Sequence, residues 1–302
     1  MKNFELLSLG IYKKSGEISV EKNFIKQLYK DADAHPRNRS RILIHKDSDS
    51  IPQEMLIAFT SKSIVEVSTH TFPESFTVLD GVAKYIFYEE SGELIGDVLL
   101  SPYENEGTFY CFIPNSTFHR FIPYTENSLA HEVGFSNFNK EFTTLYLDKQ
   151  FKDISRKTNK EYSIVPRKII NNKLDFKEKE FNDHTQVEIS GGIISISYEN
   201  IQEFVSIKKP ILLKIRDKIP AFINENILII QTNKEFMVDT EVNLQTISLI
   251  TGSITLILSN NQSITLKKGN SIFYTCANEI KICKIINSNS QLAVVKFTSH
   301  TK

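Results

Sequence analysis

Two histidines and one glutamate in the first half of the chain have the types and spacing of a metal site. His70 and Glu74 lie four residues apart, and His119 follows 45 residues after Glu74. Two imidazoles and one carboxylate form a facial triad, a ligand set suited to Fe, Mn or Zn with open coordination positions. We therefore predict His70, Glu74 and His119 as metal ligands, and Glu74 and His119 as the catalytic candidates.

Such a centre would act as a Lewis acid on a sugar carbonyl or hydroxyl. A histidine or glutamate beside it could then move a proton on the adjacent carbon, which is isomerase or epimerase chemistry. A metal-free barrel, in which the same side chains hydrogen-bond each other inside a polar cavity, is the alternative that the sequence leaves open.

A short basic segment precedes the triad. Arg37, Arg39 and Arg41 lie in a stretch without a carboxylate between Asp33 and Asp47. Alternating arginines in an extended segment project to one face, where guanidinium groups bind phosphate or carboxylate in a bidentate manner. We expect these arginines to bind a small anionic sugar, although solvated arginines are the ordinary alternative. Further polar residues are candidates for substrate binding in the same cavity: His45, Gln53, Ser68 and His131.

The residues around the triad resemble the two sequence motifs of the cupins. The first runs Ser68-Thr69-His70-Thr71-Phe72-Pro73-Glu74 and continues to Gly81, and the second is Pro114-Asn115-Ser116-Thr117-Phe118-His119. In that family the ligands converge on one metal inside a double-stranded β-barrel. Ser68 stands where the family has its first histidine, and its parity places it on the same face as His70. The resemblance therefore implies an incomplete site that binds its metal weakly.

Flanking motifs over roughly residues 20–145 resemble the WbuC-type cupins. They are the segments beginning at His35, Asp49, Phe76 and His131, together with the Pro114–His119 motif, in which Phe118 replaces that family's tryptophan. WbuC-type proteins are associated with bacterial O-antigen and other surface polysaccharide biosynthesis. The resemblance implies a sugar phosphate or a nucleotide sugar as the ligand of the first barrel.

The elements that would position these residues are mostly short strands. One helix is predicted over Val20–Asp33, from the helical spacing of Phe24 and Leu28. Short β-branched and aromatic runs follow from Arg41 and resume after Val187. We predict an all-β bicupin, with two double-stranded β-helix (jelly-roll) barrels and a short N-terminal helix. The expected units are a WbuC-like domain at 1–150, a polar linker at 151–186 with a short strand near Tyr162–Val165, and a second cupin domain at 187–302.

The second half carries no ligand set at the motif positions. Its turn at Leu266–Ser271 resembles the degenerate cupin repeat of type I mannose-6-phosphate isomerases, which implies a metal-free barrel. Gly81 and Gly252 stand at matching places in the two halves, and we predict a hairpin turn at each.

Composition limits the partners. The 36 Lys and Arg balance 36 Asp and Glu, which argues against nucleic acid as a ligand. Cys111, Cys276 and Cys283 have no metal or disulfide spacing. No stretch approaches the ~20 apolar residues of a membrane span, so we expect a soluble cytoplasmic protein without a membrane partner, and a homodimer by analogy with cupins. A non-catalytic sugar-binding or scaffolding bicupin and an Fe(II)-dependent dioxygenase are the alternatives to a sugar isomerase or epimerase.

Overall fold

A computed structural model describes residues 4–301, with gaps at 15–17, 21, 137–144, 147–174, 182, 191, 205–206, 208, 217–218, 220–222, 239–241, 268–270 and 274–281. Cys276, the strand predicted near Tyr162–Val165 and most of the predicted linker lie outside the described residues. The domain boundaries therefore stay a prediction.

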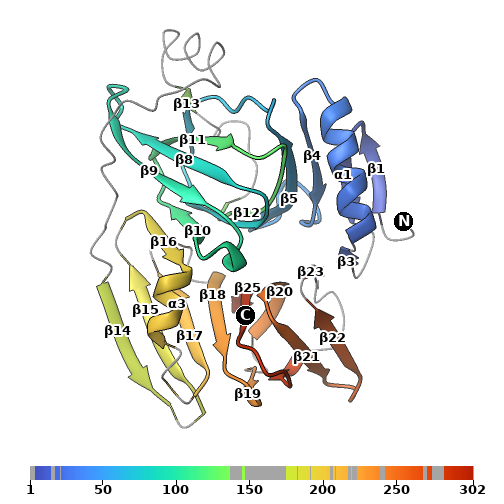
Figure 1. The fold of residues 1–302 in the computed structure, drawn as a ribbon, viewed down its shortest axis with the longest axis vertical. Coiled ribbons are helices and arrows are strands. Elements are labelled where there is room, and N and C mark those ends of the chain that lie inside the picture. Colours follow the sequence, from blue (N-terminus) through green and yellow to red (C-terminus); the bar gives the residue numbers. More distant parts are fainter. Residues whose placement is uncertain are drawn as a thin grey trace.

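The first half forms a barrel of two sheets that meet where β10 and β9 pair in parallel (Figure 1). In spatial order, the strands of one sheet are β1 (Phe4–Ser8), β2 (Ile11–Lys14), β4 (Arg39–Leu43), β5 (Gln53–Thr60), β12 (Asn127–Gly134), β7 (Glu74–Asp80) and β10 (Thr108–Ile113). Those of the other are β9 (Leu94–Leu100), β8 (Ala83–Tyr88), β11 (Phe118–Pro123), β6 (Ser68–Thr69) and β13 (Leu145–Tyr146).

The second half repeats this plan. One sheet contains β14 (Asp175–Glu180), β15 (Thr185–Ser190), β17 (Ile211–Ile215), β18 (Ile223–Ile230), β25 (Ala293–Thr301), β20 (Val242–Thr251), β23 (Ser271–Phe273) and β3 (Ile18–Val20). The other contains β19 (Lys234–Met237), β24 (Ile282–Asn287), β21 (Ser253–Leu258) and β22 (Ser263–Lys267).

The two barrels exchange strands. β3, which precedes most of the first barrel in the chain, pairs with β23 of the second. In the other direction, β16 (Ile194–Ser197) pairs with β10 of the first barrel. A 3₁₀ turn at Tyr103–Asn105 and the short helix α3 (Tyr198–Phe204) lie at this junction, where the rings of Tyr103 and Tyr198 pack at a tilt with centroids 5.0 Å apart.

Helix α1 (Lys22–Ala34) agrees with the predicted helix apart from its first residues, because Val20 ends strand β3. Phe24, Leu28 and Ala32 recur at intervals of four residues and are buried, as expected for the apolar stripe of an amphipathic helix. They pack against Ile42 and Leu56, on the outer face of β4 and β5. The helix therefore covers one end of the first barrel's sheet.

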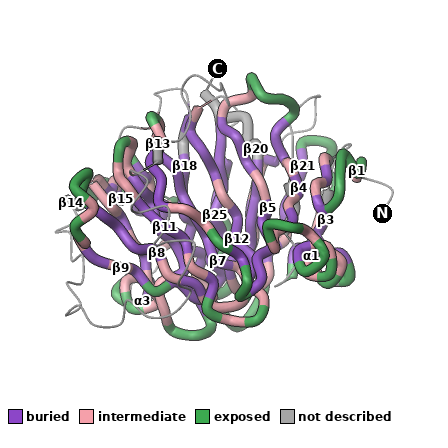
Figure 2. Tube along the Cα trace, turned by 90° about the horizontal axis from the view of Figure 1, so that it is seen from above, coloured by how far each residue is buried: buried purple, intermediate pink, exposed green. Residues whose placement is uncertain are grey.

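Strand alternation separates a barrel interior from an interface between the barrels. Phe76 of β7 and Cys111 of β10 point into the first barrel, whereas Tyr110 and Phe112 point out. The outward residues pack against residues of the second barrel such as Ile227 of β18 in one shared apolar core. Figure 2 shows this central layer of buried strands, with exposed segments around its margin.

The predicted hairpins at Gly81 and Gly252 are wrong, although both glycines end a strand as expected. Strands β7 and β8 are not hydrogen-bonded neighbours, and neither are β20 and β21. The chain instead turns a corner from one sheet of the barrel to the other. Both glycines have positive φ, +74° and +84°, and a Cβ would lie 2.3 Å from Asn127 O or 2.6 Å from Leu292 O. Only glycine fits such corners without strain.

The end of the predicted linker is structured. Asp175–Glu180 forms β14, which pairs with β15 at the edge of the second barrel's sheet. Its lysines and glutamates alternate without a strong apolar face, so the pattern of a strand is hidden by the charges that protect an exposed edge.

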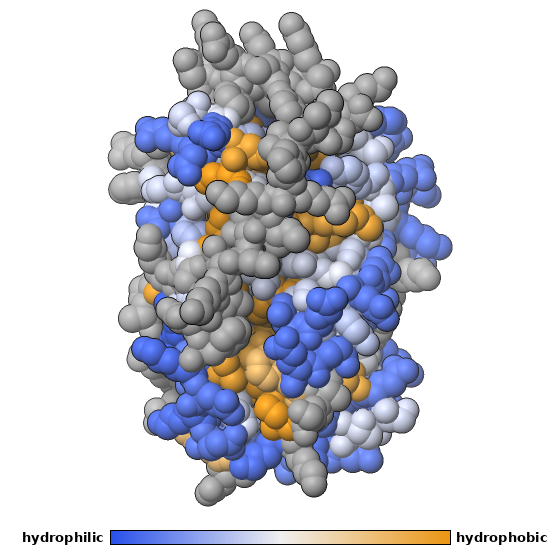
Figure 3. Space-filling model, turned by 60° about the vertical axis from the view of Figure 1, so that its left-hand side comes forward, coloured by the Kyte–Doolittle hydropathy of each residue, from blue (hydrophilic) through white to orange (hydrophobic). Residues whose placement is uncertain are grey.

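One side of the molecule is largely polar where the structure describes it. Figure 3 shows this side, on which hydrophilic side chains cover most of the described surface and apolar ones appear between them. Neither α1 nor any other helix in the described ranges has the length and hydrophobicity of a transmembrane span.

Candidate metal centre

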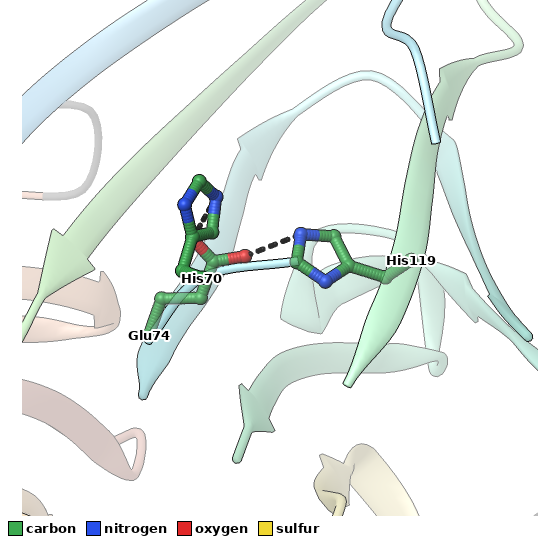
Figure 4. A group of neighbouring side chains, drawn as sticks. All are labelled: His70, Glu74 and His119. Atoms are coloured by element: carbon green, nitrogen blue, oxygen red, sulfur yellow. Dashed lines mark ion pairs between the residues drawn. The ribbon is translucent and has the colours of Figure 1, made fainter. Parts of the chain in front are cut away.

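Three elements of the first barrel bring His70, Glu74 and His119 together (Figure 4). His119 lies on β11, Glu74 is the first residue of β7, and His70 lies in the turn between β6 and β7. The backbone N–H of Ser116 donates to His70 O at 2.7 Å, which joins the turns that carry the two motifs. Residues far apart in sequence thus converge because the barrel closes.

The distances between the ligand atoms fit one small cation. His119 Nε2 lies 2.8 Å from Glu74 Oε1, and His70 Nε2 lies 3.5 Å from Glu74 Oε2. One ligand atom of each residue lies within 4.8 Å of those of the other two. Ligand atoms bound cis to a cation with bonds of about 2.1 Å are about 3 Å apart. The geometry therefore matches the predicted facial triad.

The orientation of His119 is that of a metal ligand. Its Nδ1 lies 2.9 Å from Thr117 O, and a backbone carbonyl can only accept, so Nδ1 carries the proton. A neutral imidazole then directs the lone pair of Nε2 towards Glu74 Oε1, which is also an acceptor. Two acceptors 2.8 Å apart require something between them, either a proton carried by His119 or Glu74 or a bound cation. Metal-binding histidines usually donate their other ring N–H to a carbonyl or carboxylate in this way, which fixes the orientation of the ring.

The shifts in pKa describe the alternative in which a proton, and not a metal ion, lies between Glu74 and His119. Burial alone would raise the pKa of Glu74, but His119 and His70 together hold it below its ordinary value. Burial lowers the pKa of His119, and Glu74 together with Thr117 O outweighs this effect and raises it. The pKa of His70 is lowered, chiefly by burial. A proton or a metal ion can thus occupy the same place between Glu74 and His119.

Ser68 lies where a fourth ligand would be expected. It is buried and directly opposite His119 in the pairing of β6 with β11. Residues directly opposite on one face have Cβ atoms about 4.5–5.5 Å apart. The serine hydroxyl is too short and too weak a donor to replace an imidazole, so Ser68 supplies no equivalent fourth ligand.

The remaining walls are mostly apolar and aromatic. Phe72 stacks on His70 with ring centroids 5.2 Å apart, and Tyr85 meets His119 edge-on at 5.6 Å. Cys111 is fully buried in the same interior. Burial, and secondarily the charge of Glu74, raises the pKa of its thiol, which makes it a poor nucleophile.

Glu132 is a site residue that the sequence analysis did not assign. On β12 it alternates with His131, and it shares its face with Ala130 in the core of the first barrel. The pKa of Glu132 is raised to about 8, chiefly by burial and secondarily by the charge of Glu74, whereas the charge of Arg41 opposes the increase. The sequence signal that could have identified Glu132 is alternation along β12, which puts it on the same face as the core residue Ala130.

Two of the three predicted arginines lie near Glu132. Ser40 faces α1, where its hydroxyl donates to Leu28 O at 2.7 Å, so Arg39 and Arg41 take the opposite face of β4. Both lower the pKa of Glu132 through their charge. Burial lowers the pKa of Arg41, and the charge of Glu132 opposes this. Arg37 precedes the strand and is exposed in a turn.

The other predicted substrate-binding residues are used elsewhere. His45 is buried, with Nδ1 2.9 Å from Glu54 O. The amide of Gln53 donates to the carbonyl oxygens of Asp47 and Ser50 and so fixes a loop. His131 points away from the first barrel's interior: its Nδ1 lies 3.2 Å from Ser248 Oγ of the second barrel. Alternation along β12 moves His131 out of the cavity and brings Glu132 into it.

Comparisons with known proteins identify the fold. A family model described as a domain of unknown function (DUF6016) matches residues 20–100, and no curated protein matches the sequence. Among solved structures, salicylate 1,2-dioxygenase from Pseudaminobacter salicylatoxidans is similar with a TM-score of 0.56 and 8% identity, covering 94% of this chain and 84% of that one.

Two further solved structures match with lower scores. Oxalate decarboxylase from Bacillus subtilis has a TM-score of 0.45 and 13% identity, over 87% of this chain and 72% of that one. A cupin 2 conserved barrel domain protein from Leptotrichia buccalis has a TM-score of 0.44 and 7% identity, over 87% and 89%. The chain has the predicted all-β bicupin fold of two double-stranded β-helix barrels, and in its first barrel His70, Glu74 and His119 form a cluster that could hold a metal ion.

Proposed function

We propose that this protein is a metal-dependent bicupin whose first barrel binds one divalent ion, Fe, Mn or Zn, and one small anionic substrate. The observation that carries the proposal is the approach of His119 Nε2 to Glu74 Oε1 at 2.8 Å, with the proton of Nδ1 committed to Thr117 O. His70, Glu74 and His119 would hold the ion, which would supply Lewis-acid chemistry to an oxygen of the substrate.

Arg39 and Arg41 supply the anion-binding part of the proposal. They lie on the interior side of β4, and Glu132 keeps a carboxyl group beside them. A guanidinium that is partly desolvated binds phosphate or carboxylate more strongly than one in water. A substrate anion at Arg41 would place the rest of a small molecule towards the triad.

Glu132 is the proton carrier of this proposal. If His70, Glu74 and His119 serve as ligands, a separate group is needed to move a proton on the substrate. Burial, and secondarily the charge of Glu74, raises the pKa of Glu132 to about 8, towards the pH range in which general acids and bases work best. We propose isomerase or epimerase chemistry on a sugar phosphate or nucleotide sugar in surface polysaccharide biosynthesis; the substrate class rests on the WbuC resemblance.

Metal analysis tests the proposal. Protein purified without a His tag should bind close to one Mn, Fe(II) or Zn per chain, and Glu74→Gln should remove that binding. Less than about a tenth of a metal per chain after each ion has been added would overturn it, and would leave a non-catalytic sugar-binding bicupin as the alternative.

The anion site is tested separately. Arg41→Met should weaken binding of inorganic phosphate or a sugar phosphate in titration calorimetry, whereas Arg37→Met, in the exposed turn, should have a smaller effect. Equal effects of the two substitutions would contradict the assignment of Arg41.

A second candidate function follows from the ligand set itself. Two histidines and one carboxylate with open positions are also the ligands of non-haem Fe(II) oxygenases. Oxygen uptake that depends on both Fe(II) and an added aromatic or sugar acid would favour a dioxygenase function. Turnover of a sugar phosphate without oxygen consumption would favour the isomerase.

A further inference from the structure

A buried polar cluster joins the two barrels directly behind Glu74. Its centre is the ion pair of Glu225 on β18 and Lys296 on β25, with Oε1 and Nζ 2.8 Å apart and both side chains fully buried. Two hydroxyl groups of the first barrel complete it. Tyr110 donates to Glu225 Oε2 at 2.7 Å, and Ser75 donates to Glu225 Oε1 at 2.5 Å.

Ser75 contacts both members of the ion pair. Lys296 Nζ also donates to Ser75 Oγ, at 3.2 Å, so the hydroxyl accepts from the cation and donates to the carboxylate. Charged partners give stronger hydrogen bonds than neutral ones, and the absence of solvent strengthens them further. Ser75 is therefore a firmly fixed point on β7.

The position of Ser75 in its strand connects this cluster to the metal centre. β7 begins at Glu74, immediately after the turn that contains Pro73. Successive side chains point to opposite faces, so Glu74 faces the cavity while Ser75 faces the second barrel. The cluster thus holds the residue adjacent to the ligand at the start of the strand, where β7 is paired with β10 on one side and β12 on the other.

We propose that Ser75, anchored by Glu225 and Lys296 of the second barrel, is a positioning residue that fixes the Glu74 carboxylate for metal binding. This inference rests on the proposed function, because it concerns the same metal site. The second barrel would then contribute to the metal site by positioning Glu74, although it supplies no metal ligand.

Thr77 provides a matched control on the same strand. It faces the same side as Ser75 and is equally buried, but no hydrogen bond of its hydroxyl is observed among the described residues. Ser75→Ala and Thr77→Val each remove one buried hydroxyl from the outer face of β7. Only the first removes contacts with the ion pair.

The test is metal affinity measured well below the unfolding temperature. Ser75→Ala should weaken Mn(II) binding about tenfold, in the range found for outer-shell residues, and Thr77→Val should leave it within about twofold of the wild type. Lys296→Met should weaken binding in the same direction, provided that its circular dichroism spectrum remains native. A purely structural role would lower the urea midpoint without changing Mn(II) affinity, so equal affinities of Ser75→Ala and Thr77→Val would overturn the inference.

A readout without metal separates this inference from the proposed function. If the wild type binds none of Mn(II), Fe(II) and Zn(II), the proposed function fails, and amide hydrogen exchange of the segment Glu74–Phe76 decides the remaining question. Faster exchange in Ser75→Ala than in Thr77→Val would support anchoring of the strand. Equal exchange would overturn it.

Discussion

The two barrels share a strand plan but differ in what fills their interiors. In the first, Phe87 lies six residues after the corner glycine Gly81 and pairs with His119; in the second, Leu258 lies six residues after Gly252 and pairs with Ile282. An isoleucine thus occupies the place of the ligand histidine. The comparison teaches that corners and strand order maintain the barrel, whereas a few residues near strand ends determine whether it can do chemistry.

The cores show the same contrast. The interior of the second barrel contains aliphatic side chains such as Leu256, Ile285 and Val295 in one cluster. The first barrel combines an aromatic core around Phe76 and Tyr85 with the charged group at one end. Burying carboxylates and imidazoles without partners would be costly, so the first barrel retains its polar end only because the groups pair with one another or with a cation.

The largest expected effect is the loss of the metal centre on changing one ligand. Glu74→Gln keeps the side-chain shape but replaces an anionic ligand by a neutral one. Because outer-shell changes already cost about 10–100-fold in affinity, we expect a loss of at least about 100-fold. Calorimetry with Mn(II) measures it, and Glu90→Gln on the exposed surface is the control. Unchanged binding in Glu74→Gln would remove the functional difference between the barrels.

The second prediction concerns Glu54, which lies between the barrels. Burial raises its pKa to about 7, against the opposing effects of a hydrogen bond from Thr298 and the charge of Lys296. Between its unfolded pKa of 4.5 and about 7, the unfolded carboxyl loses its proton while the folded one keeps it. Stability therefore decreases as the pH rises through this window, by about 3 kcal/mol at 1.36 kcal/mol per pH unit.

Glu54→Gln cannot ionise and should remove this contribution, leaving the decrease that comes from Glu132, whose pKa is also raised. Urea unfolding at pH 5 and pH 8 measures the difference, with exposed Glu89→Gln as a control that behaves like the wild type. His131 has a pKa lowered well below its ordinary value by burial, so its destabilising effect appears at acid pH in all these proteins. Parallel pH dependences for Glu54→Gln and the wild type would contradict the assignment.

The third prediction tests the shared corner of the two barrels. Gly81→Ala and Gly252→Ala introduce a Cβ that meets backbone oxygen at 2.3 and 2.6 Å, at positive φ. Each should lower the free energy of unfolding by about 1–3 kcal/mol, seen as a lower urea midpoint. If either variant is as stable as the wild type, the corner is not a common requirement of the two barrels.

The smallest expected effect is the gain in metal affinity when a fourth ligand is added to the first barrel, which would strengthen the contrast between the barrels. Ser68→His should place an imidazole opposite His119 and complete a four-ligand set, raising Mn(II) affinity about tenfold, or about 1.4 kcal/mol. Ser68→Ala is the control and should bind like the wild type. Weaker binding in Ser68→His would mean that the open side of the triad does not admit a fourth ligand.

Part of this architecture could be predicted from sequence, because its signals are local. The helix, the short strands and the two glycines follow from periodicity and turn residues, and the spacing of His70, Glu74 and His119 predicted the cluster that could hold a metal ion. Which face a residue takes depends on the partner of its strand. His131 was therefore predicted for the cavity and Glu132 was left unassigned, although alternation with Ala130 separates them. Glu225 and Lys296 lie far from Ser75 in the chain, and no local pattern indicates that contact.

The exchange of β3 and β16 has a consequence during synthesis. Val20 leaves the ribosome about 250 residues before its partner Ser271. At roughly 5–20 residues per second, this strand remains without its partner for more than about ten seconds. The first barrel in turn lacks its neighbour β16 until the chain has passed residue 197. The first barrel therefore cannot be finished when its own half has been translated, whereas the second barrel is completed by a strand translated near the start of the chain.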